Sequence, residues 1–142
     1  MTDDTIRLER RIAASPAAVF RYLTEAALWA RWQGESVELE PAPGGRFSVR
    51  MAGGNVVEGS VVEVQRDTRV VVTWGWHDHP RLPPGASTVE FELEPDGDGT
   101  MLRLTHRGLP PDEVPLHREG WSEFVPRLAL AAEGEEPGPS PP

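Results

Sequence analysis

The stretch Asp112–Ala132, DEVPLHREGWSEFVPRLALAA, decides the fold because it is the only long segment with the apolar period of a helix. Side chains that recur at spacings of three and four share one helical face: His117, Trp121, Phe124, Leu128 and Ala131 with Ala132. Asp112 and Glu113 lie near its start, where carboxylates favour the helix dipole, and Gly134 follows its end. One amphipathic helix cannot bury such a stripe alone, so the preceding residues must supply an apolar surface.

The residues before this helix supply that surface as strands. Apolar and polar side chains alternate, as in Thr88–Glu94, where Val89, Phe91 and Leu93 alternate with glutamates. Gly59 lies inside one of these segments and predicts a bulge or a close approach of two backbones. We expect strands over Thr5–Ala13, Val37–Glu40, Arg46–Met51, Val56–Gln65, Val70–Trp76, Thr88–Glu94 and Thr100–Arg107.

Two short helices are expected between the first two strands. Ser15 and Pro16 are a helix start, with a hydroxyl at the N-cap and proline at the first helical position. The helices should cover Ala17–Leu23 and Glu25–Trp32 and close one end of the sheet. The fold class is therefore α+β: a curved antiparallel sheet of about seven strands grips the long helix, with a ligand-sized cavity between them.

Length and composition limit the remaining possibilities. A chain of 142 residues is one domain, which we assign to residues 1–132, and the acidic, Gly- and Pro-rich tail 133–142 should be disordered. The net charge of −9 argues against nucleic acid or an anionic membrane as a partner. The chain has no cysteine, no signal peptide and no apolar run long enough to cross a membrane, so we expect a cytoplasmic protein.

Several short motifs carry a resemblance to a known family. They are Ser15–Phe20, Leu28–Trp32, Pro43–Phe47, Gly59–Val64 with Val70–Trp74, Gly99–Thr100 with Leu104–Leu109, and Gly120–Trp121. In this order, from about Thr5 to Ala132, they resemble the helix-grip (START-like, SRPBCC) superfamily. The nearest group is the bacterial one named after the C-terminal domain of the activator of Hsp90 ATPase. The resemblance implies a container for a small hydrophobic or amphipathic molecule. Pro126 departs from the pattern, because proline inside a helix removes a hydrogen bond and favours a kink.

The aromatic residues are the main candidates for a ligand site. Five tryptophans are many for this length, and Trp74, Trp76 and Trp121 fall on the apolar faces of sheet and helix. They could stack on a planar ligand, or they could be ordinary core. The residues expected to line the site are Phe20, Trp32, Phe47, Met51, Trp74, Phe91, His106, His117 and Trp121.

The histidines are the candidates for acid–base chemistry. His106 lies on the inward face of its strand, and His117 lies on the helix stripe, so the two could face each other across the cavity. His77-Asp78-His79 has donors for a metal, but it falls on a Pro-rich loop without a second ligand cluster, so we expect no metal site. We also expect no cofactor.

Three function classes remain open at this point. The favoured one is a module that binds a small hydrophobic or aromatic molecule. An enzyme using the same cavity, of cyclase, dehydratase or hydrolase type with His106 as base, is the minority interpretation. A module that binds a chaperone or regulatory partner through its acidic surface is the third. The exposed strand edges permit a homodimer without requiring one.

Overall fold

The computed structural model describes residues 4–142 as seven strands, three α-helices and one short 3-10 helix. The strands are β1 (Ile6–Ile12), β2 (Ser36–Leu39), β3 (Arg46–Arg50), β4 (Val56–Gln65), β5 (Arg69–Trp76), β6 (Ser87–Asp96) and β7 (Gly99–Arg107). The helices are α1 (Pro16–Thr24), α2 (Ala26–Trp29), the 3-10 helix η1 (Pro111–Glu113) and α3 (Val114–Ala132). The predicted α+β fold is confirmed. Some elements differ in length from their predicted ranges, most of all α2, which ends at Trp29 rather than Trp32.

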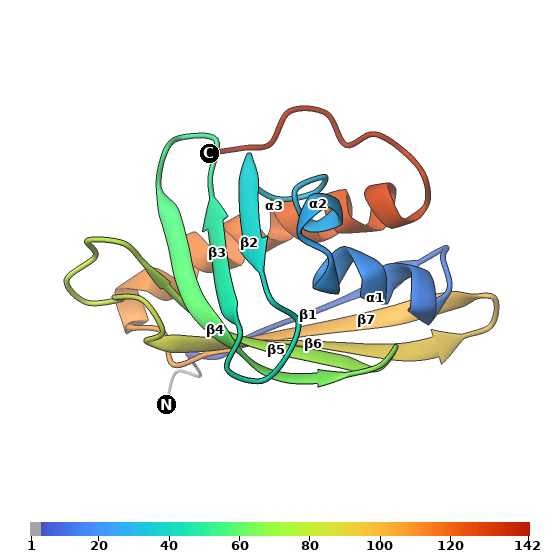
Figure 1. Cartoon of the computed structure of the whole chain (residues 1–142), viewed down its shortest axis with the longest axis horizontal. Helices are drawn as coiled ribbons and strands as arrows, with labels where there is room; N and C mark the ends of the chain where they lie inside the picture. The colour runs from blue at the N-terminus through green and yellow to red at the C-terminus, as the bar shows by residue number, and fades with distance from the viewer. Residues whose placement is uncertain (1–3) are drawn as a thin grey trace.

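All seven strands form one antiparallel sheet in the order β1-β7-β6-β5-β4-β3-β2. Consecutive strands from β2 to β7 are neighbours, and the first strand closes the order by pairing with the last. Strands β2, β3 and β4 rise from the layer formed by β1, β7, β6 and β5, and α3 crosses the concave side (Figure 1). Helices α1 and α2 lie beside α3 over the same side.

Strand β4 carries the bend of the sheet. A Cβ at Gly59 would lie 2.0 Å from the carbonyl oxygen of Thr73 on β5, so the two backbones approach closely at this glycine. The register between β4 and β5 then shifts between Val61 and Glu63, which is a bulge at Val62. Of the two alternatives at Gly59, the structure shows the close approach there and a bulge three residues later. Bulges increase strand twist, so this segment explains how the sheet curves.

The space between α2 and the sheet is filled by aromatic rings. Trp29, Trp32, Phe47 and Phe91 are all fully buried. The ring of Trp29 lies 4.8 Å from that of Trp32, 5.1 Å from Phe47 and 5.7 Å from Phe91, measured between centroids. Aromatic rings at these separations pack favourably in tilted and edge-on arrangements. This end of the domain is therefore a solid core.

Helix α3 buries the stripe that its sequence predicts. Its buried residues are Val114, His117, Trp121, Phe124, Val125, Leu128, Ala129 and Ala131. Pro126 lies inside the helix without ending it, since α3 is assigned continuously from Val114 to Ala132. The guanidinium of Arg127 projects from this helix and donates to the carbonyl oxygen of Trp32 at 3.0 Å.

The tail 133–142 makes polar contacts with the domain. Arg127 donates to the carbonyl oxygens of Pro137 and Gly138, at 3.0 and 2.8 Å. The backbone N–H of Gly34 donates to the hydroxyl of Ser140, and the tail runs along the outside of the helices toward β3 (Figure 1). Burial lowers the pKa of Arg127, and carbonyl oxygens from the tail supply its acceptors. Disorder of this tail stays a prediction from its composition.

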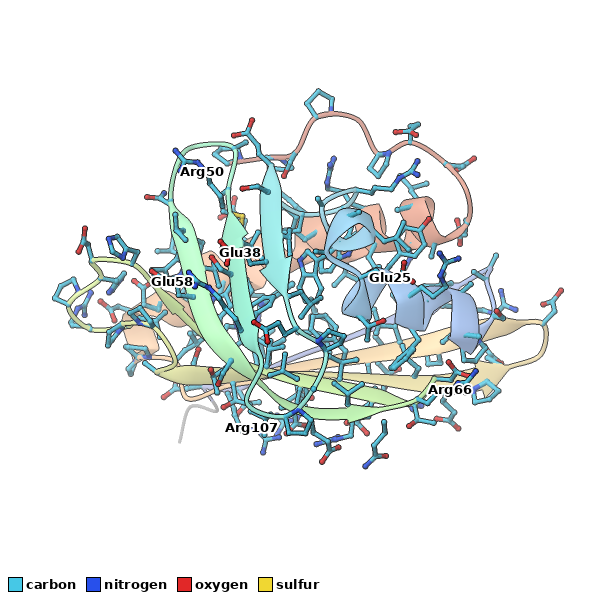
Figure 2. The ribbon with its side chains drawn as sticks, in the orientation of Figure 1. Glu25, Glu38, Arg50, Glu58, Arg66 and Arg107 are labelled. Carbon is cyan, nitrogen blue, oxygen red and sulfur yellow. The ribbon has the colours of Figure 1, made fainter. Side chains whose placement is uncertain are left out.

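Charged side chains cover the outside of the sheet. Figure 2 shows the labelled Glu38, Arg50 and Glu58 on the face of β2–β4 turned away from α3. Glu38 pairs with Arg46 across the β2–β3 ladder at 2.8 Å. Within residues 4–142, none of the helices combines the length and hydrophobicity that a membrane span requires.

The burial of α3 predicts how strongly single side chains on it stabilise the fold. Leu128 is fully buried, whereas Leu116 on the same helix is 62% exposed. Leu128→Ala should lower the free energy of unfolding by about 2–5 kcal/mol through lost burial and a residual cavity. Leu116→Ala should change it by less than about 0.5 kcal/mol. Urea unfolding followed by tryptophan fluorescence measures both, and equal losses would contradict this packing.

Candidate functional site

A pocket of about 600 Å³ lies at the N-terminal end of α3. One wall is the helix itself, through Glu113, Leu116, His117, Gly120, Trp121 and Phe124. The opposite wall comes from the end of β5, with Trp74 and Trp76, and from the loop 77–80 that follows it. The lining is completed by Met51 and Asn55 beside the β3–β4 turn, by Gln33 before β2, and by Pro142 of the tail. The pocket is partly open to solvent, and Leu116 in its lining is exposed.

The structure brings four of the nine predicted site residues together around this pocket. They are Met51, Trp74, His117 and Trp121. Trp32, Phe47, Phe91 and His106 are fully buried in the core instead, and Phe20 packs against the core from α1. The central space between sheet and helix, expected to be hollow, is filled by the rings of Trp29 and its neighbours, so the pocket lies at one end. A ligand-binding role for any of the nine residues stays a prediction.

His106 is held by a chain of hydrogen bonds that uses both ring nitrogens. The indole N–H of Trp121 donates to its Nδ1 at 3.0 Å, so Nδ1 carries no proton. Nε2–H of the neutral ring then donates to the hydroxyl of Ser87 at 2.8 Å, and that hydroxyl donates to the carbonyl oxygen of Trp74 at 2.7 Å. The chain leaves His106 no free lone pair, so it fits a structural role better than that of a base.

His117 is held in the opposite tautomer. Its Nδ1–H donates to the carbonyl oxygen of Glu113 at 2.9 Å, and its Nε2 accepts the indole N–H of Trp76 at 3.0 Å. The rings of His106 and His117 do face each other, with centroids 5.3 Å apart and planes nearly perpendicular. Each histidine is thus paired with one tryptophan, and these pairs connect α3 to the sheet.

Burial sets the protonation of both histidines. Burial first, and the neighbouring His117 second, lower the pKa of His106 from 6.5 to about 3. Burial also lowers the pKa of His117, although its hydrogen bond to the Glu113 carbonyl opposes the shift. Both rings are therefore neutral near pH 7, as their hydrogen bonds require.

Trp74 carries a polar atom that the fold leaves without a partner. Its indole N–H is buried and has no hydrogen-bond acceptor among residues 4–142. A buried donor left unpaired costs about 1–3 kcal/mol.

The two histidines of the motif His77-Asp78-His79 contact different partners. His77 is exposed and pairs with Glu58 on β4 at 2.9 Å. Nδ1 of His79 accepts the backbone N–H groups of Arg81 and Leu82, at 3.2 and 2.9 Å, and so fixes the loop. In the part of the chain that the structure describes, no group of three or more acidic, histidine or cysteine side chains could hold a metal ion.

Sequence reasoning missed several residues of the pocket wall. Glu113, Leu116 and Gly120 precede or alternate with His117 and Trp121 at the same helical spacings, so extending the stripe toward the helix start would have found them. Glu113 was interpreted only as a favourable charge at the helix start. The loop 77–80 and Pro142 carry no such signal, since only tertiary folding brings them to the pocket.

The sequence and fold can now be compared with known proteins. A sequence model of the family described as "Activator of Hsp90 ATPase homolog 1-like protein" matches residues 13–133, which is most of the chain. The chain belongs to this family. The resemblance expected from the short motifs is therefore confirmed, together with the SRPBCC-type helix-grip fold.

Solved structures share the fold of this chain. The solution structure of an AHSA1-like protein from Rhizobium etli is 43% identical, covers 96% of this chain and 86% of its own, and superposes with a TM-score of 0.75. A crystal structure from Mesorhizobium loti is 29% identical, with coverage of 92% and 97% and a TM-score of 0.82. The Aha1 dimer from Colwellia psychrerythraea, 21% identical with coverage of 94% and 97% and a TM-score of 0.80, shares the fold. No curated protein matches this chain significantly.

The low pKa of His106 predicts a specific loss of stability in acid. Between pH 6.5 and about 3 the unfolded state binds a proton that the folded state excludes, so the free energy of unfolding falls as the pH falls. At pH 4.5 the free energy of unfolding lost through His106 amounts to about 2–3 kcal/mol, because each pH unit below 6.5 contributes about 1.4 kcal/mol. In His106→Gln, whose amide can accept from Trp121 and donate to Ser87, the difference in stability between pH 7 and pH 4.5 should shrink by that amount.

Urea titrations at both pH values measure the effect. His77→Gln, which changes an exposed histidine, is the matched control and should keep the wild-type pH dependence. The same pH dependence in His106→Gln and wild type would refute the proposed protonation of His106.

Proposed function

We propose that this protein binds one small hydrophobic or aromatic molecule in the pocket at the N-terminal end of α3. The observation that carries the proposal is the pocket itself, about 600 Å³ and walled by the indole rings of Trp74, Trp76 and Trp121. Pockets of this size and apolar character are typical of small-molecule sites.

Catalysis by His106 has less support than binding. A general base needs a free lone pair directed at the substrate, and both nitrogens of His106 and of His117 are engaged in hydrogen bonds. Protonating either ring would set its new N–H against the indole N–H of a tryptophan. The arrangement favours a site that holds a molecule over one that moves its protons.

A homodimer is a further part of the proposal. Among residues 4–142, strands β1 and β2 form the two edges of the sheet, and the outer side of each pairs with no other described strand. The Colwellia psychrerythraea protein, which shares the fold, is described as a dimer. Dimerisation is compatible with ligand binding, because the pocket lies between α3 and the loop 77–80 rather than along either edge.

Gly120 offers a direct test of where the ligand binds. It lines the pocket from α3, and a Cβ at this position would meet nothing within 4 Å. Gly120→Leu should therefore fill the pocket and weaken binding of the uncharged fluorescent probe N-phenyl-1-naphthylamine by about tenfold or more. Stability should stay the same or rise by up to about 1 kcal/mol, since glycine is a poor helix former. Probe fluorescence and urea unfolding measure the two effects.

Ser122→Leu is the matched control. It adds the same side chain to an exposed position on the same helix, away from the pocket, and should leave probe affinity unchanged. Failure of the wild-type protein to bind the probe, or equal binding by wild type and Gly120→Leu, would count against the proposed site.

A further inference from the structure

The pocket contains a carboxylate that no cation of the described chain neutralises. Glu113 lies at the start of α3, is 8% exposed and lines the pocket. Its side chain makes no hydrogen bond to cap the helix. Among residues 4–142, no arginine comes within salt-bridge distance of it: Arg81, the closest in the loop sequence, pairs with Asp112 instead. The chain contains no lysine.

Among residues 4–142, the basic side chains that lie within 4 Å of this carboxylate are two imidazoles, and each has one ring nitrogen that accepts N–H groups. Nε2 of His79 lies 3.5 Å from Glu113 Oε1, and Nδ1 of His117 lies 3.9 Å from it. His79 Nδ1 accepts two backbone N–H groups, so the imidazole turns Nε2 toward Glu113. His117 Nε2 accepts from Trp76. In the described part of the chain no arginine offsets the Glu113 charge, which the positive end of the helix dipole stabilises.

Aromatic rings surround the same space. Trp74, Trp76 and Trp121 line the pocket with Glu113, and Trp76 stands next to His117 with ring centroids 6.0 Å apart. The faces of indole rings attract cations. A buried charge is stabilised when it is paired and hydrogen-bonded. A carboxylate and several indoles around one pocket therefore provide complementary attraction for a positively charged group on an apolar body.

We propose that the ligand of this pocket is an organic cation: an aromatic or hydrophobic molecule carrying an ammonium group that pairs with Glu113. This inference rests on the proposed function, because it names the chemical class of the molecule held in that pocket. The ammonium donates hydrogen bonds to the free carboxylate oxygens, and the apolar body lies against the indole rings. The net charge of −9 attracts such a ligand at long range.

Two probes of matched shape separate charge recognition from apolar binding. They are 2-(2-naphthyl)ethylammonium and the uncharged 2-(2-naphthyl)ethanol, with affinities measured by titration calorimetry. In the wild-type protein the ammonium should bind about tenfold more tightly than the alcohol, because charge-assisted hydrogen bonds and cation–π contacts favour it. In Glu113→Gln the ratio should fall to about one, with the alcohol affinity unchanged within about twofold.

Two controls distinguish a local ion pair between the ammonium and Glu113 from long-range attraction by the acidic surface. Glu123→Gln removes the same charge from an exposed position of α3 and should preserve the wild-type ratio. In the wild type the ratio should persist at about 0.5 M salt, where attraction from distant surface charges is screened. The salt measurement does not depend on any variant folding.

The outcomes distinguish the inference from the proposed function. If both probes bind with equal affinity, or if the ratio survives in Glu113→Gln or vanishes in salt, recognition of a cation is refuted while apolar binding stands. If neither probe binds, the proposed function fails and the inference fails with it.

Discussion

The contact between Trp121 of α3 and the sheet is the interaction on which the rest of the structure depends. Its ring lies 5.0 Å from that of Trp74, and its N–H donates to His106 on β7. One residue therefore supplies both apolar burial and a buried hydrogen bond across the helix–sheet interface. Burial keeps His106 neutral, and the bond from Trp121 occupies the lone pair that a second proton would need. The same contact thus positions the helix and fits the neutral form of the histidine.

The location of the pocket follows from how this interface is filled. Toward the C-terminal half of α3 the rings of Trp29, Trp32 and Phe91 pack closely, with Trp32 and Phe91 6.4 Å apart. Toward the N-terminal half, Gly120 contributes no side chain and the wall moves outward to the loop 77–80. Polar groups collect at the same end, where the helix start, the loop and the strand ends meet. A helix-grip fold can thus have a filled core at one end and a pocket at the other.

The sequence predicted the architecture more completely than the site. Alternation in segments such as Thr88–Glu94 and the stripe through Trp121 report which side of an element is buried, so the antiparallel meander and the gripped helix could be predicted from local patterns. The pairing of β1 with β7 depends on tertiary contacts and was not predicted. The same patterns cannot tell a core ring from a pocket ring. Phe47 and Trp74 looked equivalent, yet only Trp74 lines the pocket. Whether a ring lies in the core or in the pocket wall depends on the side chains packed around it. Around Trp74 the tertiary neighbours Gly120, Glu113 and the loop 77–80 leave a pocket.

The account makes one central claim, that a guest binds beside Trp74, Trp76 and Trp121 and leaves the opposite end of the core undisturbed. Each of the five tryptophans gives one indole N–H signal in a ¹H–¹⁵N NMR spectrum, so a titration with 2-(2-naphthyl)ethanol reports on both ends at once. The account predicts shifts of the signals from Trp74, Trp76 and Trp121, with those of Trp29 and Trp32 unchanged. Shifts confined to Trp29 and Trp32, or no shift at saturating probe, would contradict it.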